Sequence, residues 1–228
     1  MKPLLISPPF GNWLKSSHCT RVLGSFTWER RRGLLYHTLR SLRSVPGGWV
    51  NEIGLRNPGI RACKFDARHI YSVVGLLDGD WELILHHCPP TLTVEVNLGC
   101  PNVHEYGIPP AVLRCYCETF NVIAKLSPTA MVDDTAAMCI EAGARYLHLS
   151  NTIPTARGGE SGRRLFGINL PIVARLAARY PGKIIAGGGI YDTAALAHYR
   201  AAGATHFSLA TVWLTPWRGR EIVRSLQP

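Results

Sequence analysis

The chain has 228 residues, of which 46% are hydrophobic and 18% charged, a composition typical of a globular protein and too apolar for a disordered one. The formal net charge is +10, but the densest basic run is only Arg30–Arg32, so a nucleic-acid partner is not expected. No apolar run approaches the roughly 18 residues that a membrane span needs, and the N-terminus does not resemble a signal peptide. We therefore expect a soluble, cytoplasmic protein.

The cysteine pattern also indicates a reducing compartment. Seven cysteines form an odd set without a secretory signal, so we expect free thiols. No pair has the C-x-x-C spacing, and the sequence predicts no metal or iron–sulfur site within the chain. Five of the cysteines are expected to be small buried side chains, namely Cys63, Cys88, Cys115, Cys117 and Cys139.

Strand-like and helix-like runs alternate along the chain. The first 90 residues hold three predicted strands, near Leu4–Ile6, Arg21–Leu23 and Ile70–Val74. Five strand–helix pairs follow: Thr91–Asn97 with Pro110–Phe120, Val122–Leu126 with Asp133–Ala142, Tyr146–Ser150 with Leu170–Arg179, Lys183–Ala186 with Thr193–Ala202, and His206–Ala210 with Arg218–Ser225. Eight such units favour an α/β fold, a single-domain (β/α)8 TIM barrel over residues 1–228. A doubly wound sheet is the alternative, because the first half is irregular.

Polar and glycine-rich residues follow the predicted strands where a barrel gathers its reactive groups. These segments are Asn97–Asn102, Lys125, Ser150–Thr152, Gly187–Gly189 and Ala210–Thr211. Each alone has a structural explanation as a turn or a loop cap. Together, the small residues after the last two strands predict a phosphate site, because glycine lets the backbone approach an anion. Gly158–Gly162 would bind a second part of the same phosphorylated cofactor.

Seven motifs in order resemble the dihydroorotate dehydrogenase family. The run Asn97–Val103 (NLGCPNV) is similar to the family's N-L-S-C-P-N-V signature, and Asn51–Gly59 is similar to its N-S-x-G-L-x-N-x-G substrate loop. The other matches are Lys125–Pro128, Asn151–Thr152, Gly158–Gly162, Ile184–Ile190 and Ala210–Thr211. The resemblance implies an FMN-binding TIM barrel that oxidises dihydroorotate to orotate in pyrimidine biosynthesis. The cysteine before Pro-Asn resembles class 1 enzymes, which implies a homodimer or a flavin and iron–sulfur partner subunit.

The resemblance also implies a role for each matching residue. Cys100 would take the C5 proton of the substrate while a hydride leaves C6 for the flavin, and Lys125 would lie against the flavin. Substrate contacts would come from Asn51, Gly54, Leu55, Asn97, Asn102, Asn151 and Thr152. FMN contacts would come from Gly11, Ser25, Lys125, Ser161, Gly162, Gly188, Gly189, Ala210 and Thr211.

Two substitutions depart from the family pattern. Gly24 stands where the family has a lysine that contacts flavin and substrate, and Glu52 stands where a small serine is usual. Gly24→Lys is therefore expected to raise the rate of flavin reduction by dihydroorotate, unless an arginine of Arg30–Arg32 supplies the cation.

Two other functions stay open. Gly99–Pro101 and the positive charge also fit a tRNA dihydrouridine synthase, and the missing lysine fits a degenerate barrel that serves as a structural subunit.

Overall fold

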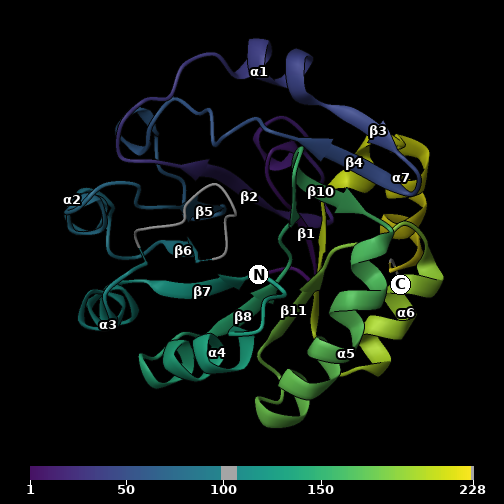
Figure 1. Ribbon diagram of the computed structural model, residues 1–228. Helices are drawn as coiled ribbons and strands as arrows, with labels where there is room; N and C mark the ends of the chain where they lie inside the picture. The colour runs from purple at the N-terminus through teal and green to yellow at the C-terminus, as the bar shows by residue number, and fades with distance from the viewer. Residues whose placement is uncertain (99–106, 227–228) are drawn as a thin grey trace.

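The computed structural model describes residues 1–98 and 107–226, and within them eight parallel strands close into a barrel (Figure 1). The spatial order is β1-β12-β11-β8-β7-β6-β5-β2. The strands are β1 (Leu4–Ile6), β2 (Cys19–Phe26), β5 (Ile70–Val73), β6 (Thr93–Asn97), β7 (Asn121–Leu126), β8 (Tyr146–Leu149), β11 (Ile184–Gly187) and β12 (His206–Leu209). Each corresponds to a predicted strand. The (β/α)8 prediction is confirmed, and the doubly wound alternative is wrong.

Helices cover the outside of the barrel from β5 onward (Figure 1). They are α2 (Asp80–His87), α3 (Pro110–Thr119), α4 (Val132–Glu141), α5 (Arg164–Arg179), α6 (Thr193–Ala201) and α7 (Pro216–Ser225). The helix predicted from Leu170 begins at Arg164 and continues through Pro171. Proline breaks the sequence signal for a helix because it removes one backbone donor, yet α5 buries Leu165, Val173 and Leu176. Burial of this apolar face outweighs the lost hydrogen bond.

Side-chain alternation along the strands produces two separate apolar layers. Leu5, Val22, Ile70, Ile123 and Ile185 form a cluster inside the barrel, and a larger cluster fills the space between strands and helices. Because successive strand residues point to opposite faces, the register of these five residues fixes which polar residues face inward.

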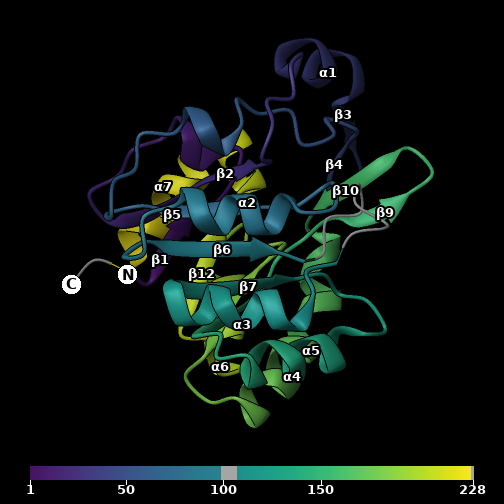
Figure 2. The same ribbon diagram turned by 90° about the vertical axis from the view of Figure 1, so that its left-hand side faces the viewer.

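A second, smaller sheet lies at one end of the barrel. It has the order β3-β4-β10-β9, built from β3 (Arg43–Val45), β4 (Gly48–Asn51), β10 (Gly158–Gly162) and β9 (Ile153–Thr155). Figure 2 shows β4, β9 and β10 at the end toward which the arrows of β6 and β7 point, and both termini at the other end. This sheet was not predicted. It places the Asn51 loop over the carboxyl ends of the barrel strands.

The connections near the start of the chain explain the irregular first half. Between β1 and β2 the only regular element is the short 3-10 helix η1 (Phe10–Asn12), where a standard barrel has a covering helix. Between β2 and β5 the chain forms α1 (Leu34–Ser41), β3, β4 and the 3-10 helix η2 (Ile60–Ala62). A further 3-10 helix, η3 (Thr211–Leu214), follows β12.

The structure tests the expected burial of the cysteines. Of the five cysteines expected to be buried, Cys88 and Cys139 are buried, whereas Cys63 and Cys117 are half-buried and Cys115 is exposed on α3. Helical periodicity at Cys115 places its side chain on the solvent face, so that expectation was wrong for this residue.

Across residues 1–98 and 107–226, no helix has the length and hydropathy needed to cross a bilayer.

Candidate functional site

A cavity of about 370 Å³ opens at the carboxyl ends of the barrel strands, below the small sheet. This volume lies within the range of small-molecule sites. Thirteen sequence-predicted site residues line it: Ser25, Asn51, Gly54, Leu55, Asn97, Lys125, Asn151, Thr152, Ser161, Gly188, Gly189, Ala210 and Thr211. They come from strands and loops that are distant in sequence, so the barrel brings together most of the candidate site.

Among the predicted site residues that the structure describes, Gly11 and Gly162 are not in that lining. Gly11 is buried against the barrel, where an added Cβ would lie 2.0 Å from the Val22 carbonyl oxygen. Gly162 packs on the Gly48 turn at a φ of +131°. Both glycines pack closely against neighbouring backbone, and their roles as cofactor contacts stay predictions. Cys100 and Asn102 lie outside the described residues.

Side-chain amides and hydroxyls form a hydrogen-bonded row across the cavity floor. Asn97 Nδ2 donates to Ser25 Oγ at 3.1 Å, and Asn151 Nδ2 donates to Asn97 Oδ1 at 3.2 Å. Ser25 Oγ lies 2.9 Å from Ser72 Oγ, and the Thr152 amide donates to Asn151 Oδ1 at 3.3 Å. The row links β2, β5, β6 and β8. Because an amide offers both donors and an acceptor, it can bind a ring that carries alternating carbonyl and N–H groups.

The loop after β4 is held over the cavity by a buried side chain. Asn57 Nδ2 donates to the Leu55 carbonyl at 2.7 Å and to Thr27 Oγ1 at 3.0 Å, while its Oδ1 accepts from the Gly59 amide at 2.8 Å. Leu55 has a φ of +55°, a strained value that these bonds maintain. Glu52 is exposed and does not line the cavity, so its carboxylate points away from the site.

The glycine turn after β11 supplies the opposite wall. Gly188 and Gly189 have φ values of +82° and +75°, a region that glycine adopts without strain. Asn169 Nδ2 donates to the Gly187 carbonyl at 2.8 Å, and Tyr199 Oη donates to the Gly188 carbonyl at 2.8 Å. Gly187 pairs with Ser208 on β12, which places Ala210 and Thr211 at the neighbouring strand end. Two neighbouring strand ends without bulky side chains therefore line this side of the cavity.

A buried charge network lies beneath the cavity, inside the barrel. Glu95 on β6 has its Oε2 atom 2.6 Å from His148 Nδ1 on β8, and its Oε1 atom 3.8 Å from Lys125 Nζ on β7. Glu95 and His148 are fully buried, and Lys125 is 8% exposed at the cavity floor. Glu95 thus provides the counter-charge that keeps an ammonium group at this depth.

The network shifts the titration of both buried partners. Desolvation alone would raise the pKa of Glu95, but the positive charge of Lys125 and the contacts with His148 and Ser72 outweigh it and lower the pKa to about 2. Burial lowers the pKa of His148, which outweighs the opposing effect of Glu95. At neutral pH the site therefore contains an ionised Glu95 and a neutral His148.

Comparison with known proteins gives consistent matches. No family model matches the chain. A protein of Aeropyrum pernix that is assigned as dihydroorotate dehydrogenase A (fumarate) is 29% identical over 90% of this chain and 77% of its own length. The catalytic subunit of dihydroorotate dehydrogenase B (NAD(+)) from Cutibacterium acnes is 28% identical over 91% of this chain and 81% of its own. The ligand-free structure of the Eimeria tenella DHODH superposes with a TM-score of 0.70, at 17% identity, over 98% of this chain and 83% of that chain.

The curated relatives match 90% and 91% of the chain, at 29% and 28% identity. The chain is therefore similar to the dihydroorotate dehydrogenases over nearly its whole length. The surroundings of Gly24 restrict which side chain this position can hold. A Cβ at Gly24 would lie 2.5 Å from the Ser72 carbonyl oxygen, and the residue has a φ of +118°. A lysine cannot enter without moving β2 or β5, and the expected gain in rate from Gly24→Lys stays a prediction.

The cavity contains an arginine that lies outside the Arg30–Arg32 segment expected to supply a cation. Arg56 lines it, whereas Arg30–Arg32 do not, although Arg31 Nε donates to the Gly54 carbonyl at 3.3 Å. Arg56 Nε is buried, with no hydrogen-bond partner in the described part of the chain. Among the lining residues that the structure describes, Arg56 and Lys125 are the cations, and no carboxylate is present. The described lining of the cavity therefore has an excess of positive charge.

Several lining residues were missed because they carry no motif. The apolar walls include Phe10, Trp13, Trp49, Leu34, Leu42 and Tyr191. For those in the first half of the chain, only the density of tryptophan and proline could have indicated an apolar wall.

Glu95 and His148 had a clearer sequence signal, because each is a polar residue at an inward position of an otherwise apolar strand.

Proposed function

We propose that the chain binds FMN and oxidises dihydroorotate to orotate. The observation that carries this proposal is the joint position of Asn51, Asn97, Asn151 and Lys125 in one cavity whose described lining has no carboxylate. Dihydroorotate and FMN phosphate are both anions, and an electropositive cavity favours both. The amide row matches the carbonyl and N–H groups of a dihydropyrimidine ring.

The residues present also fit the cofactor. Gly188, Gly189, Ala210 and Thr211 would hold the phosphate, because these two strand ends lack bulky side chains. Ser25 and Lys125 would contact the flavin ring, with the ammonium group favouring negative charge on it. Ser161 on β10 lines the same cavity. When bound, FMN supplies a hydride acceptor at its N5 atom.

The chain's own groups would orient the substrate and move its proton. Asn51, Asn97 and Asn151 would bind the ring amides, and the loop residues Gly54 and Leu55 would cover it. By its match to the family signature, Cys100 would accept the C5 proton, because a thiol pKa near 8.5 is lowered by nearby positive charge. Asn102 and Thr152 complete the proposed substrate contacts. The α1 and Trp49 side of the cavity would exclude water.

Partners are proposed from the relatives' names. The Cutibacterium acnes relative is described as a catalytic subunit of an NAD(+)-linked enzyme. We propose that this chain likewise passes electrons to a separate flavin and iron–sulfur subunit, or acts as a homodimer. A place in pyrimidine biosynthesis and in the cytoplasm follows from the same proposal.

A spectroscopic experiment tests the proposed function. The purified protein should be yellow, with about one FMN per chain, and dihydroorotate should bleach the flavin under nitrogen. Protein that bleaches with dithionite but not with dihydroorotate, and whose reduced flavin is reoxidised by tRNA, would support the dihydrouridine synthase alternative. Protein that retains no flavin would support the structural-subunit alternative and overturn the proposal.

We expect Ala210→Asp to abolish FMN retention. The substitution places a negative charge at the proposed phosphate position, where like charges repel. Ala210→Asn is the matched control, with nearly the same size and no charge, and it should retain most of the flavin. Flavin content per chain and far-UV circular dichroism of both variants provide the measurement. Equal flavin content in the two variants would place the phosphate elsewhere. Gly188 is less suitable, because a Cβ there would lie 2.6 Å from Asn169 Nδ2.

Arg56→Gln should weaken orotate binding by about 10- to 100-fold, the effect of losing one hydrogen bond to a charged group. FMN content should not change. Titration of the flavin absorbance with orotate measures the dissociation constant. Arg32→Gln removes an exposed charge from outside the cavity and serves as the control. A similar weakening in both variants would show that Arg56 acts only through net charge.

A further inference from the structure

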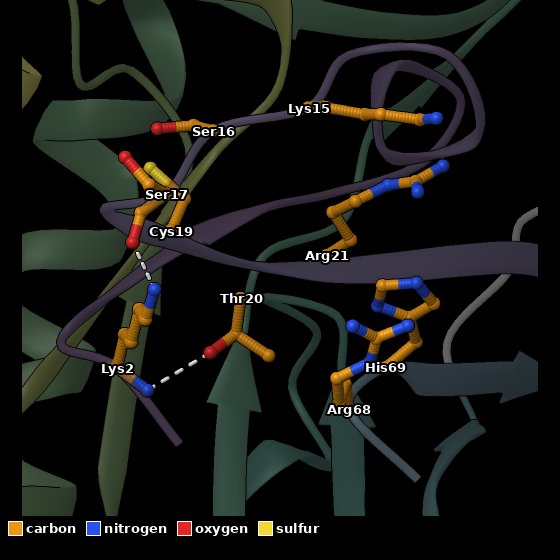
Figure 3. A pocket seen from close by; sticks show the side chains of 9 residues that line it. All are labelled: Lys2, Lys15, Ser16, Ser17, Cys19, Thr20, Arg21, Arg68 and His69. Carbon is orange, nitrogen blue, oxygen red and sulfur yellow. Dashed lines mark hydrogen bonds between the residues drawn. The ribbon is translucent and has the colours of Figure 1, made fainter. Parts of the chain in front are cut away.

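A second cavity, of about 620 Å³, lies on the outer side of the barrel near the amino ends of its strands (Figure 3). It is lined by Lys2, Lys15, Ser16, Ser17, Cys19, Thr20, Arg21, Arg68 and His69. These residues precede β1, lie in or near the start of β2, and precede β5. The cavity is therefore at the opposite end of the barrel from the proposed flavin site.

The cavity exists because the connection from β1 to β2 is incomplete as a barrel unit. Val22 faces the barrel interior, so its neighbour Arg21 points outward. A helix would normally cover that outer face, but residues 7–18 contain only η1. Lys15, Ser16 and Ser17 from this connection form one wall of the uncovered space.

The lining has a strong excess of positive charge. Four of the nine residues are lysine or arginine, and none is a carboxylate. Asp66, just outside the lining, pairs with Arg68 through Oδ2 at 2.7 Å, so the unpaired excess comes from Lys2, Lys15 and Arg21. Figure 3 shows the Lys15 and Arg21 side chains reaching toward the same side of the cavity, with His69 and Arg68 below them in the view. Like charges that line one cavity repel one another, and an anion bound among them would relieve that repulsion.

Hydrogen bonds to the surrounding chain hold several polar side chains of this cavity in place. Arg21 Nε donates to the Gly11 carbonyl at 2.8 Å and Nη2 to the Asn12 carbonyl at 3.1 Å, which fixes the guanidinium. Lys2 Nζ donates to the Ser17 carbonyl, and the Lys2 amide donates to Thr20 Oγ1 at 2.9 Å. His69 Nδ1 is buried without a hydrogen-bond partner in residues 1–98 and 107–226. Burial and the nearby Arg21 charge lower the pKa of His69, so its ring can donate or accept at neutral pH.

We propose that this cavity binds a small organic phosphate with at least two negative charges. Three cations match a diphosphate group, and fixed guanidinium groups bind phosphate oxygens well. The volume exceeds that of a phosphate group alone, and the hydroxyls of Ser16, Ser17 and Thr20 can bind the hydroxyl-rich part of such a ligand. The cationic residues gather in this one cavity and do not extend in a long basic run along the chain, which favours a small molecule over an RNA strand.

The test is calorimetric titration at low ionic strength with pyrophosphate, ADP and UDP, using protein loaded with FMN at the barrel mouth and freed of unbound FMN by gel filtration. We expect one site per chain, tighter binding of a nucleoside diphosphate than of pyrophosphate, and at least a tenfold weakening by Lys15→Glu. Lys15 is exposed, so its charge can be reversed without affecting the core. Lys64→Glu is the control, since Lys64 is exposed on the loop before β5 and does not line the cavity.

Arg21→Gln provides a second variant and should also weaken binding at least tenfold. Equal weakening by Lys15→Glu and Lys64→Glu would overturn the proposal, because it would show attraction to net charge alone. Absence of saturable diphosphate binding, or binding of oligouridylate RNA in place of the three small ligands, would overturn it as well. None of these outcomes depends on turnover of dihydroorotate, so this test and the test of the proposed function can fail independently of each other.

Discussion

Cys100→Ala should retain FMN and bind orotate, yet reduce the rate of flavin reduction by dihydroorotate by a factor of about 10²–10⁴. This is the usual contribution of a positioned general base. The expected loss falls on the chemical step because the substrate would still be held by Asn51, Asn97 and Asn151, which line the cavity. Anaerobic stopped-flow absorbance at the flavin band measures the rate in a single turnover.

The matched control is Cys115→Ala, which removes an exposed thiol from α3 and should leave the rate unchanged. Cys100→Ser should also be slow at neutral pH, because a serine hydroxyl is a much weaker base than a thiolate. A Cys100→Ala rate equal to that of the wild type would remove this residue from the mechanism. It would leave the proposal of flavin binding intact.

Glu95→Gln should lower the free energy of unfolding by about 3–5 kcal/mol, the cost of removing one partner from a buried ion pair. The amide keeps the size of the side chain but leaves Lys125 buried near the cavity floor without a counter-charge. It also changes the 2.6 Å contact with His148. Urea denaturation followed by tryptophan fluorescence gives the free energy and its slope.

Asp133→Asn is the control for Glu95→Gln. It breaks an ion pair with Arg175 at 2.7 Å whose side chains are substantially exposed, so its effect should be much smaller. The pH dependence supplies a second criterion. Because the pKa of Glu95 falls from 4.5 to about 2 on folding, its contribution is present above pH 4.5 and is lost as the pH falls toward 2. The variant should lose less stability across that interval, and an unchanged slope would contradict the assignment.

The sequence predicted the strands well because their patterns are short and strongly apolar. Thr93–Asn97 and His206–Leu209 are bounded by turn residues, and their burial leaves little freedom in register. Motif order also identified thirteen residues of the cavity lining, since the carboxyl ends of barrel strands meet at one face. These thirteen residues come from eight separate segments of the chain.

The errors arise where tertiary contacts override local signals. Gly158–Gly162 contains three glycines and no β-branched residue, so it reads as a loop, yet pairing with β4 makes it a strand. Gly24 could be aligned with a family lysine, but only the structure shows the Ser72 carbonyl at the position of its Cβ. Arg56 was overlooked because nothing in the motif indicates which side of the loop faces the cavity.

The pairing of β4 with β10 has a consequence for the order of assembly. Asn51 pairs with Gly159, and Val50 pairs with Glu160, so two segments that are far apart in the chain must meet before the loop over the cavity is fixed. Contacts of such high sequence separation form late, because the entropy of closing the intervening chain is lost first. During synthesis the N-terminal half emerges well before β10. The first strands of the barrel can therefore begin to pair on the ribosome, whereas the binding loop acquires its native conformation only after β10 has been synthesised.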